Sequence, residues 1–581
     1  MNSTYVRGHK LSNIYEVKKN EIIIGLSAYL HDSSVCFLKN GEIIYASQEE
    51  RHTRIKNDRN FPFLAILNGI EYLGIKKTDI SKIIFHESLN ITKQNKKNIL
   101  KKKILNDLSF IGLENFDLYF VDHHYSHAAA GYYSSDFENA LIFTFDGMGE
   151  GISTSIFYGH QNSITNLKKI REPNSLGLLY SAFTYFLGFD VNSGEYKMMG
   201  LSPFGKKQYE DIIFSKLITQ FEDGSFEVNK EYFNFYGNEI IINNQNFEEL
   251  FSIKKRESHL EIKDVHCDIA ASIQSVIEKI IFKIIAKELE KFNTKNIVLG
   301  GGVALNCIAN GKIEKKFKKK INIFPSPGDS GNSFGSAIYA SYSSPEFNDQ
   351  KKMRIKNVFF GRDYSSEYKS VLSLIDKLNL RSKTFTSYDT IVDLLIDKKI
   401  IGFFSGRSEF GPRSLGNRSI IADPRSIDAQ KTINLKVKFR ESFRPFAPII
   451  IENLASTYFD NCFESPFMQK TYYVKDSWLT KSNKNAGSSI FEKINQSRSQ
   501  FPSITHVDNS ARVQTISDQE LPIYKLLEKF YKKTGCPMLI NTSFNVNNEP
   551  IVETPFDAIK TFINTNIDYL VIDNLILSKN K

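Results

Sequence analysis

The sequence lacks any long hydrophobic run. Its longest apolar stretches, such as NALIFTF (139–145) and NIVLGGGVAL (296–305), are far shorter than the ~20 residues that a helix needs to cross a membrane. The opening residues, MNSTYVRGHK, lack the apolar segment of a signal peptide. We therefore expect no membrane partner and no secretion signal.

Cysteine is scarce, with 5 among 581 residues. An odd number of cysteines with no CxxC pair predicts neither a disulfide framework nor a thiolate zinc site. This usage is typical of the reducing cytoplasm, which is where we expect the protein to act.

The charge of the chain carries little information about nucleic acids. The formal net charge is +10, and much of it lies in two lysine-rich runs, TKQNKKNILKKK (92–103) and KKFKKK (315–320). Such runs are more typical of solvated helix faces than of nucleic-acid sites. We expect no nucleic-acid partner, and the remaining positive charge suits small anionic substrates.

Two stretches of the chain share one pattern. In residues 20–51 a strand, a polar turn and a second strand lead through Asn40-Gly41 to a third strand at 42–48, and residues 139–160 repeat the strand, Gly-rich turn and strand. Two such units predict a duplicated α/β core, the arrangement of the actin-like (ASKHA, RNase H-like) ATPases. Glycine-rich turns before helical patterns recur at 296–313 and 324–344.

The length predicts two or more domains. A polar, charged stretch, SSPEFNDQKKMRIKN (343–357), separates the duplicated core from a second α/β pattern that begins at VFFGRDY. We expect an N-terminal domain at 1–345, a linker at 346–356 and a C-terminal domain at 357–581.

The segment HHYSHAAAGYY (123–133) concentrates histidines in a chain that has only 11. His123 and His127 lie four residues apart, so on a helix they share one face and can bind one metal ion. The alternative is that one histidine caps the helix and the other is packed. Asp146 and Asp329 favour the metal, because both lie in Gly-rich turns that should meet at the central cleft. Mixed nitrogen and oxygen ligands suit Fe(II), Mn(II) or Zn(II).

Basic residues are dense in the C-terminal half. Guanidinium groups beside glycines that expose the backbone suit bidentate binding of phosphate oxygens. The alternative is that some of them form surface ion pairs with Glu409 and Glu441. The candidate phosphate ligands are Arg407, Arg413, Arg418, Lys438, Arg440 and Arg444, and Arg512, Ser543 and Asn545 extend the candidate pocket.

The ordered set of motifs resembles the O-carbamoyltransferases of antibiotic and nodulation-factor biosynthesis. The set covers residues 22–556. The matching stretches include GLSAYLHDSSVCFLKNGEIIYASQEER, DHHYSHAAAGYY, FDGMGEG, SGEYKMMGLSPFG, GGGVALNCIANG, SPGDSGNSFGSA, GRSEFGPRSLGNRSIIADPR, VKFRESFRPFAPII, THVDNSARVQTI and INTSFNVNNEPIV.

The resemblance implies two activities in one chain. The N-terminal domain would be similar to metal-dependent tRNA threonylcarbamoyl transferases, and the C-terminal domain to threonylcarbamoyl-adenylate synthases. The C-terminal domain would make carbamoyl adenylate from carbamoyl phosphate and ATP, with Mg²⁺ accompanying the ATP. The N-terminal domain would move the carbamoyl group to a hydroxyl of a small-molecule or sugar acceptor.

The resemblance also implies roles for single residues. His123, Asp146 and Asp329 would bind the metal, with Fe(II) the expected ion and His127 a ligand or a close neighbour. His31 matches the catalytic candidate of the family, and Lys438 and Arg413 would act on the phosphates in adenylate formation. Gly301, Gly302 and Asn306 would contact the adenylate, unless GGGVALN only packs a strand on a helix, and Lys197 would face the nucleotide or pair with Glu195.

Two positions depart from the family pattern. Asn548 and Asn509 stand where glycine is expected, and asparagine tolerates the left-handed conformation that such turns need. We expect both turns to survive.

Two other functions remain open at this point. An actin-like metabolite kinase would explain the duplicated core but would release ADP instead of AMP and pyrophosphate. A tRNA-modifying protein would use the lysine runs and bind RNA in a salt-sensitive manner. The acceptor cannot be identified from the sequence, and the oligomeric state, a homodimer included, stays open.

Overall fold

The computed structural model describes residues 3–7, 15–87, 94–235, 241–352, 354–480, 492, 494 and 496–580. It divides into two compact units, each built from several stretches of chain. The first comprises Met1–Ser27, Val35–Ile43 and Lys76–Ile355, and the second Ala28–Ser34, Ile44–Ile75 and Lys356–Lys581. Among the described residues no helix is long and apolar enough to span a membrane.

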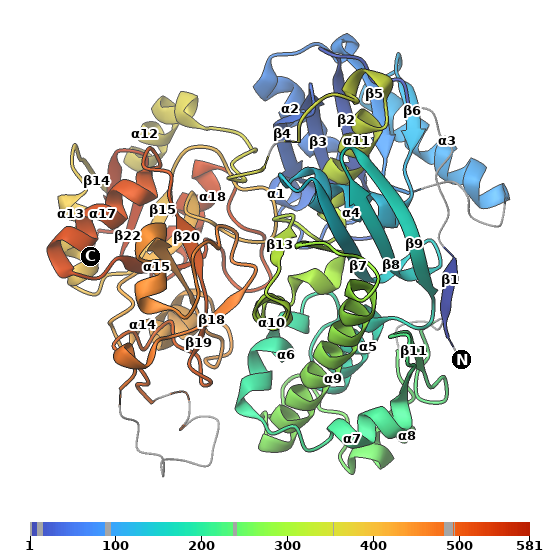
Figure 1. The fold of residues 1–581 in the computed structure, drawn as a ribbon. Coiled ribbons are helices and arrows are strands. Elements are labelled where there is room, and N and C mark those ends of the chain that lie inside the picture. The colour runs from blue at the N-terminus through green and yellow to red at the C-terminus, as the bar shows by residue number, and fades with distance from the viewer. Residues whose placement is uncertain are drawn as a thin grey trace. The chain divides into compact units, whose positions relative to one another are not determined.

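Two sheets built from residues 5–323 share one order of five strands (Figure 1). The first sheet consists of β4 (Glu42–Gln48), β3 (Ser34–Lys39), β2 (Ile22–Ser27), β5 (Ile80–Phe85) and β6 (Asp117–Phe120). The second consists of β1 (Tyr5–Arg7), β9 (Ser163–Arg171), β8 (Ile152–His160), β7 (Asn139–Gly149), β12 (Asn296–Gly300) and β13 (Lys320–Ile323).

The strand order confirms the duplicated actin-like core. Counted along the chain from β2 or from β7, the five core strands of each sheet lie in the order third, second, first, fourth, fifth. In both sheets the first strand pairs parallel with the fourth, and the fourth with the fifth. The predicted Asn40-Gly41 turn is present between β3 and β4, with φ of 55° and 78°.

Helices of the first unit pack on and beside these sheets. Those that position the candidate site are α4 (His123–Tyr133), α5 (Leu176–Phe186), α9 (Asp264–Leu289), α10 (Cys307–Phe317) and α11 (Asn332–Tyr342). Helices α4 and α11 cross closely, because a Cβ on Gly335 would lie 1.9 Å from the carbonyl oxygen of Ser126. The described part of the first lysine-rich run lies on α3 (Gln94–Phe110), where Lys101, Lys102 and Lys103 are exposed, and residues 92–93 lie outside the described residues.

The second unit is an α/β layer around one mixed sheet. The strands, in order across the sheet, are β14 (Arg381–Thr384), β23 (Leu575–Ser578), β22 (Tyr569–Ile572), β15 (Ile401–Phe404), β16 (Arg418–Ala422), β21 (Met538–Ser543), β17 (Ala447–Ile451) and β20 (Gln514–Ile516). The helices α12 (Tyr368–Lys377), α13 (Asp389–Ile396), α15 (Glu452–Tyr458), α17 (Pro522–Thr534) and α18 (Pro555–Ile563) belong to it. Helix α17 begins at a proline and ends before Gly535, whose φ of 72° closes the last turn.

An N-terminal segment, residues 44–75, is part of this second unit. It carries the helices α1 (Glu49–Thr53) and α2 (Phe63–Leu73). The guanidinium of Arg51 donates to the carbonyl of Gly411 at 2.9 Å, and that of Arg54 donates to the carbonyls of Pro550 and Ile551 at 2.9 and 2.7 Å. The chain leaves the first unit for the last time after Ile355, which lies within the predicted linker, 346–356. The predicted division into two continuous domains stays a prediction.

The two asparagines that replace expected glycines adopt the conformation that the turns require. Asn548 has φ of 61° and Asn509 has φ of 64°, both in the left-handed region. Both turns survive the replacement, as predicted.

Candidate functional site

Helix α4 presents two histidines on one face. The carboxylate of Asp122 caps the helix by accepting the backbone N–H groups of His124 and Tyr125, so the first helical residue is His123. His123 and His127 lie one turn apart and are both buried. The third histidine, His124, points elsewhere, with Nδ1 2.7 Å from Thr144 Oγ1.

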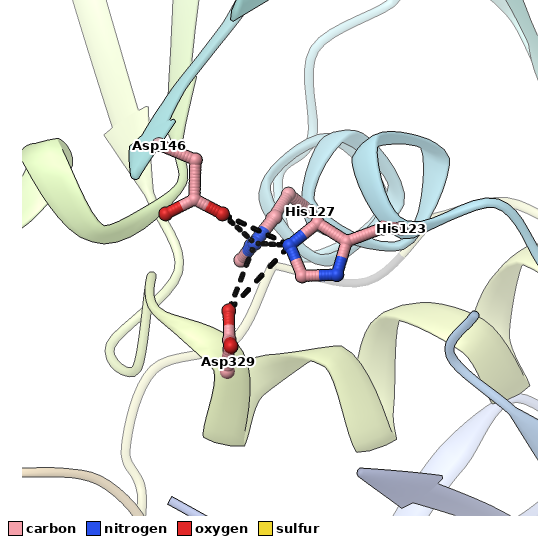
Figure 2. A group of neighbouring side chains, drawn as sticks. All are labelled: His123, His127, Asp146 and Asp329. Atoms are coloured by element: carbon pink, nitrogen blue, oxygen red, sulfur yellow. Dashed lines mark hydrogen bonds and ion pairs between the residues drawn. The ribbon is translucent and has the colours of Figure 1, made fainter. Parts of the chain in front are cut away.

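Two carboxylates meet these histidines (Figure 2). Asp329 begins the short 3-10 turn Asp329–Gly331 that leads into α11. Asp146 lies within β7, not in a turn after it as the sequence predicted, because β7 continues to Gly149. The β7–β8 register shifts between Phe145 and Gly149, and this irregularity includes Asp146.

The four side chains converge on one point. His123 Nε2 is 3.1 Å from His127 Nε2 and 2.9 Å from Asp146 Oδ2, and Asp146 Oδ2 is 3.2 Å from His127 Nε2. Asp329 Oδ1 lies 3.6 Å from His123 Nε2 and 3.4 Å from His127 Nε2. Ligand atoms ~2.1 Å from a tetrahedral metal are separated by roughly 3.4 Å, so the donor set fits a divalent metal ion.

Charge complementarity is strong in this cluster. Burial alone would lower the pKa of His123, but the carboxylates of Asp329 and Asp146 raise it to about 10. Burial opposes ionisation of Asp146, yet hydrogen bonds from the two histidines hold the pKa of its carboxyl well below the usual range. A metal ion would replace the protons that now stabilise the two carboxylates.

Glycines surround the cluster because larger side chains would not fit. A Cβ on Gly149 would lie 2.3 Å from the His123 ring, and one on Gly301, whose φ is 82°, would lie 2.2 Å from the Phe145 carbonyl oxygen. The N–H of Gly302 donates to Asp146 Oδ1 at 3.0 Å and so orients the carboxylate whose other oxygen faces the histidines. Gly301 and Gly302 therefore have a packing and positioning role, and their predicted contact with an adenylate stays a prediction.

Two further residues predicted to bind the nucleotide are buried. Asn306 Oδ1 accepts the N–H of Ala309 and thereby caps α10, and its amide exchanges hydrogen bonds with that of Gln274. Lys197 lies with Nζ 6.0 Å from the centre of the Phe189 ring. The carboxylate of Glu195, proposed as a partner of Lys197, accepts hydrogen bonds from Ser181 and from the backbone of Asn192.

Sequence reasoning missed two residues beside the cluster. Glu150 accepts the backbone N–H of His123 at 2.8 Å, and Asn332 places Nδ2 3.2 Å from His127 Nε2. Glu150 follows Asp146 in the same FDGMGEG stretch, and Asn332 follows Asp329 by three residues. Only their closeness in sequence to predicted ligands could have signalled them.

In the second unit, Lys438 contacts two other residues of the predicted phosphate site, Ser543 and Asn545. Its ammonium donates to Asn545 Oδ1 at 2.7 Å, to Ser543 Oγ at 3.1 Å and to the Ser543 carbonyl. Lys438 is 1% exposed. Burial, and then the positive charges of Arg440 and Arg444, hold the pKa of Lys438 well below its usual value. A buried cation among neutral oxygens and other cations is an arrangement that an anion would stabilise.

The remaining predicted phosphate ligands have different surroundings. Arg440 Nε donates to Asn434 Oδ1 at 2.8 Å, and Arg444 lies 3.7 Å from Glu441, an ion pair that the alternative reading expected. Arg413 is partly exposed, and Arg512, also partly exposed, ends β19 (Ser510–Arg512).

Arg407 and Arg418 are committed to the protein's own backbone. Arg407 donates to the carbonyls of Gly361, Phe360 and Ile44 at 2.7 to 2.9 Å. Arg418 is 0% exposed, donates to the carbonyls of Ser405, Asn417 and Glu553, and stacks on Phe404. The described contacts give both arginines a structural role, so we leave them out of the phosphate-binding set proposed below. Glu409, their suggested partner, instead accepts backbone N–H groups of residues 415, 417 and 418.

His31 lies in the stretch Ala28–Ser34, which belongs to the second unit. Its Nδ1 is 3.1 Å from Asp32 Oδ2, and its side chain is 41% exposed. Asp32 has φ of 55°. This geometry agrees with a turn-shaping role beside Asp32, and the catalytic role stays a prediction.

Family models match most of the chain. The model described as carbamoyltransferase N-terminus matches residues 22–98 and 88–338, and the one described as carbamoyltransferase C-terminus matches residues 392–579.

Several relatives are similar over nearly the whole chain. The uncharacterized protein sll1178 of Synechocystis is 38% identical, with 96% of each chain covered. Nodulation protein NolNO of Sinorhizobium fredii is 32% identical over 95% of this chain and 80% of its own. The HypF structure from T. kodakarensis is 14% identical with a TM-score of 0.35, covering 59% of this chain and 50% of that one. Because this TM-score and identity are low, the fold assignment rests on the strand order.

Proposed function

Because the chain belongs to the carbamoyltransferase family, we propose that it is an ATP-dependent O-carbamoyltransferase in which the predicted C-terminal domain (357–581) makes an adenylate and the predicted N-terminal domain (1–345), which includes His31, transfers the carbamoyl group. In the first step carbamoyl phosphate, ATP and water give carbamoyl adenylate, pyrophosphate and phosphate. In the second step a hydroxyl of a small-molecule or sugar acceptor takes the carbamoyl group, and AMP leaves. The observation that carries the proposal is the buried His123, His127, Asp146 and Asp329 cluster within a chain of this family.

We assign adenylate formation to the second unit. Lys438, held by Ser543 and Asn545, would contact phosphate oxygens, together with Arg413, Arg440, Arg444 and Arg512. Positive charge is needed where the phosphate and the pyrophosphate leave, since negative charge develops there in the transition state. Lysine serves as a point charge and arginine as a bidentate fork. Mg²⁺ would accompany the ATP.

We assign carbamoyl transfer to the first unit. His123, His127, Asp146 and Asp329 would hold a divalent metal, for which we propose Fe(II), and this ion would supply Lewis-acid polarisation of the carbamoyl oxygen. Gly302 keeps Asp146 in place through its N–H, and Gly149 leaves room for the His123 ring because it has no side chain. Lys197, Asn306 and the backbone at Gly301 would border the adenylate.

We assign proton transfer from the acceptor hydroxyl to His31. The unperturbed pKa of a histidine, roughly 6.5, suits a general base near neutrality. His31→Asn should fold, keep its metal and make carbamoyl adenylate, yet transfer the carbamoyl group about 100-fold more slowly. Near-normal transfer by this variant would reduce His31 to a turn residue, and loss of metal would make it a ligand.

Product analysis tests the proposed function. The full-length protein is incubated with ATP, carbamoyl phosphate and a panel of hydroxyl compounds, and the nucleotides and acceptors are resolved by mass spectrometry. The proposal requires AMP, pyrophosphate and an acceptor heavier by one carbamoyl group. Release of ADP with a phosphorylated acceptor would indicate a kinase, and modification of tRNA alone would indicate a tRNA-modifying enzyme.

A further inference from the structure

A fifth polar side chain faces the cluster of His123, His127, Asp146 and Asp329. Asn332, the first residue of α11, is 0% exposed. Its Nδ2 lies 3.2 Å from His127 Nε2, the atom that also faces both aspartates. Its Oδ1 is buried and has no hydrogen-bond partner among the described residues. A buried amide oxygen without a partner destabilises the folded protein, so its presence calls for an explanation.

The contact between Asn332 and His127 cannot persist with a metal in the cluster. A His127 Nε2 that binds a metal, or that donates its proton to Asp146, has no lone pair to accept a hydrogen bond from Nδ2. Half a turn about the last side-chain bond exchanges the two amide atoms of Asn332 and leaves its backbone in place. Oδ1 would then lie about as far from His127 Nε2 as Nδ2 does now, within the 2.9 to 3.6 Å that separate the two histidine nitrogens from each other and from the aspartate oxygens.

The backbone holds this amide in position. Helix α11 cannot move away from α4 without losing the close crossing at Gly335, where only 1.9 Å would separate a Cβ from the Ser126 carbonyl oxygen. The turn before α11 is equally tight, because a Cβ on Gly331 would lie 1.9 Å from the Ser326 carbonyl oxygen. Asp329 and Asn332 are thus fixed together on one turn of chain, facing the histidines of α4.

We propose that Asn332 is a fifth metal ligand, bound through Oδ1. This inference deepens the metal site of the proposed function and does not depend on carbamoyl transfer. Two imidazole nitrogens and three oxygens form a set that Mn(II) and Fe(II) accept, leaving one further position for water or substrate. Zn(II), which prefers four ligands in structural sites, would gain less from Asn332.

Metal titration of the full-length protein tests the ligand. Asn332→Ala should weaken Mn(II) binding by about 10- to 100-fold, measured by competition with a chelator, and should weaken Zn(II) binding less. Asn332→Asp, which retains an oxygen at this position, should bind Mn(II) at least as tightly as the wild type. The visible spectrum of the Co(II)-loaded protein should become more intense in Asn332→Ala, because four-coordinate Co(II) absorbs more strongly than five- or six-coordinate Co(II).

A matched control separates ligation from packing. Asn310 is also a buried asparagine of the first unit, and its Nδ2 donates to the Ala304 carbonyl at 2.8 Å. Asn310→Ala should lower the melting temperature without changing Mn(II) affinity or the Co(II) spectrum. If Asn332→Ala fails to fold, Asn332→Ser, which is polar but too short to reach the cluster, takes its place.

Unchanged Mn(II) affinity and an unchanged Co(II) spectrum in a folded Asn332→Ala or Asn332→Ser protein would overturn the inference. This result would leave the proposed function intact, because metal binding is measured without substrates. Failure of the wild-type protein to bind any divalent metal would instead contradict the metal site itself.

Discussion

The two units differ in how the charge of a buried cluster is balanced. In the first unit, two imidazoles and two carboxylates face one another, and each shifts the pKa of its partners toward the charged form. In the second unit, Lys438 is buried among neutral oxygens of Ser543 and Asn545, and its nearest charges are positive.

The contrast indicates the sign of the charge that each cluster is suited to bind. A buried ion is stable only when a group of opposite charge accompanies it. Carboxylates that converge on one point call for a cation, whereas a buried lysine flanked by arginines calls for an anion. Both signs agree with the proposed ligands, a metal ion in one unit and phosphates in the other.

Removing a carboxylate from the first cluster should have the largest effect. Asp329→Ala should lose bound metal and slow carbamoyl transfer by at least about 100-fold, because one of the two negative charges that stabilise the ion is gone. Formation of carbamoyl adenylate in the second unit should continue. Metal analysis and the two separate assays check this, and full metal occupancy in the variant would exclude Asp329 as a ligand.

Removing the lysine should produce the reverse pattern. Lys438→Met keeps the length of the side chain but not its charge, and should slow pyrophosphate release from ATP and carbamoyl phosphate by about 100- to 1000-fold. Metal content and transfer from supplied carbamoyl adenylate should stay at wild-type levels. A variant that also fails with supplied adenylate would contradict the division of labour between the units.

A third variant tests whether Arg407 belongs with the proposed phosphate-binding residues of the second unit. Arg407→Met should lower the free energy of unfolding by about 1–2 kcal/mol, because it removes the guanidinium that donates to the partly buried carbonyls of Gly361, Phe360 and Ile44. The KM values for ATP and carbamoyl phosphate should not change. Arg413→Ala is the matched comparison and should raise those KM values with little loss of stability.

The smallest effect concerns a buried histidine without a carboxylate partner. Burial, and then the positive charge of Arg256, lower the pKa of His266 to about 4, whereas the carboxylates raise that of His123. His266 Nδ1 accepts the backbone N–H of Lys263 at 2.8 Å, so protonation breaks this bond at the start of α9. Because the folded pKa lies below the unfolded value, the stabilisation is complete above pH ~6.5 and is lost as the pH falls toward 4.

Replacement of His266 by glutamine should remove this pH dependence. A glutamine at this position can accept the same hydrogen bond without titrating. Wild type should lose about 1–2 kcal/mol more than His266→Gln between pH 7 and pH 4, a figure reduced for the partial solvent access of the ring. Chemical denaturation at the two pH values measures the difference, and parallel curves would show that His266 does not titrate on unfolding.

The grouping of His123, His127, Asp146 and Asp329 could be predicted from the sequence because its signals are local. The HxxxH spacing fixes the relation of His123 and His127, and glycine-rich stretches after apolar strands mark Asp146 and Asp329. The duplicated α/β core was predicted from a repeated strand, Gly-rich turn and strand, and the strand order itself came only from the structure. Asn332 and Glu150 could not be predicted, because neither has a spacing or neighbour that distinguishes it from an ordinary polar residue.

The basic region was harder to predict because arginine serves two purposes. A guanidinium fork that suits a phosphate equally suits backbone carbonyls, and residue type alone does not tell which acceptor lies within reach. Arg407 and Arg418 donate to carbonyls that the sheet and the segment 44–75 bring within reach. No local sequence pattern predicted that this segment belongs to the second unit.

The membership of residues 44–75 in the second unit has a consequence for synthesis of the protein on the ribosome. Arg51 and Arg54 emerge early, but their partners, Gly411, Pro550 and Ile551, emerge several hundred residues later. At about 5–20 residues per second, the segment waits for its partners on the order of tens of seconds. During that time the segment is without the residues at 356–581 with which it forms one unit in the finished protein. We therefore expect nascent chains halted before residue 411 to bind chaperones through this segment.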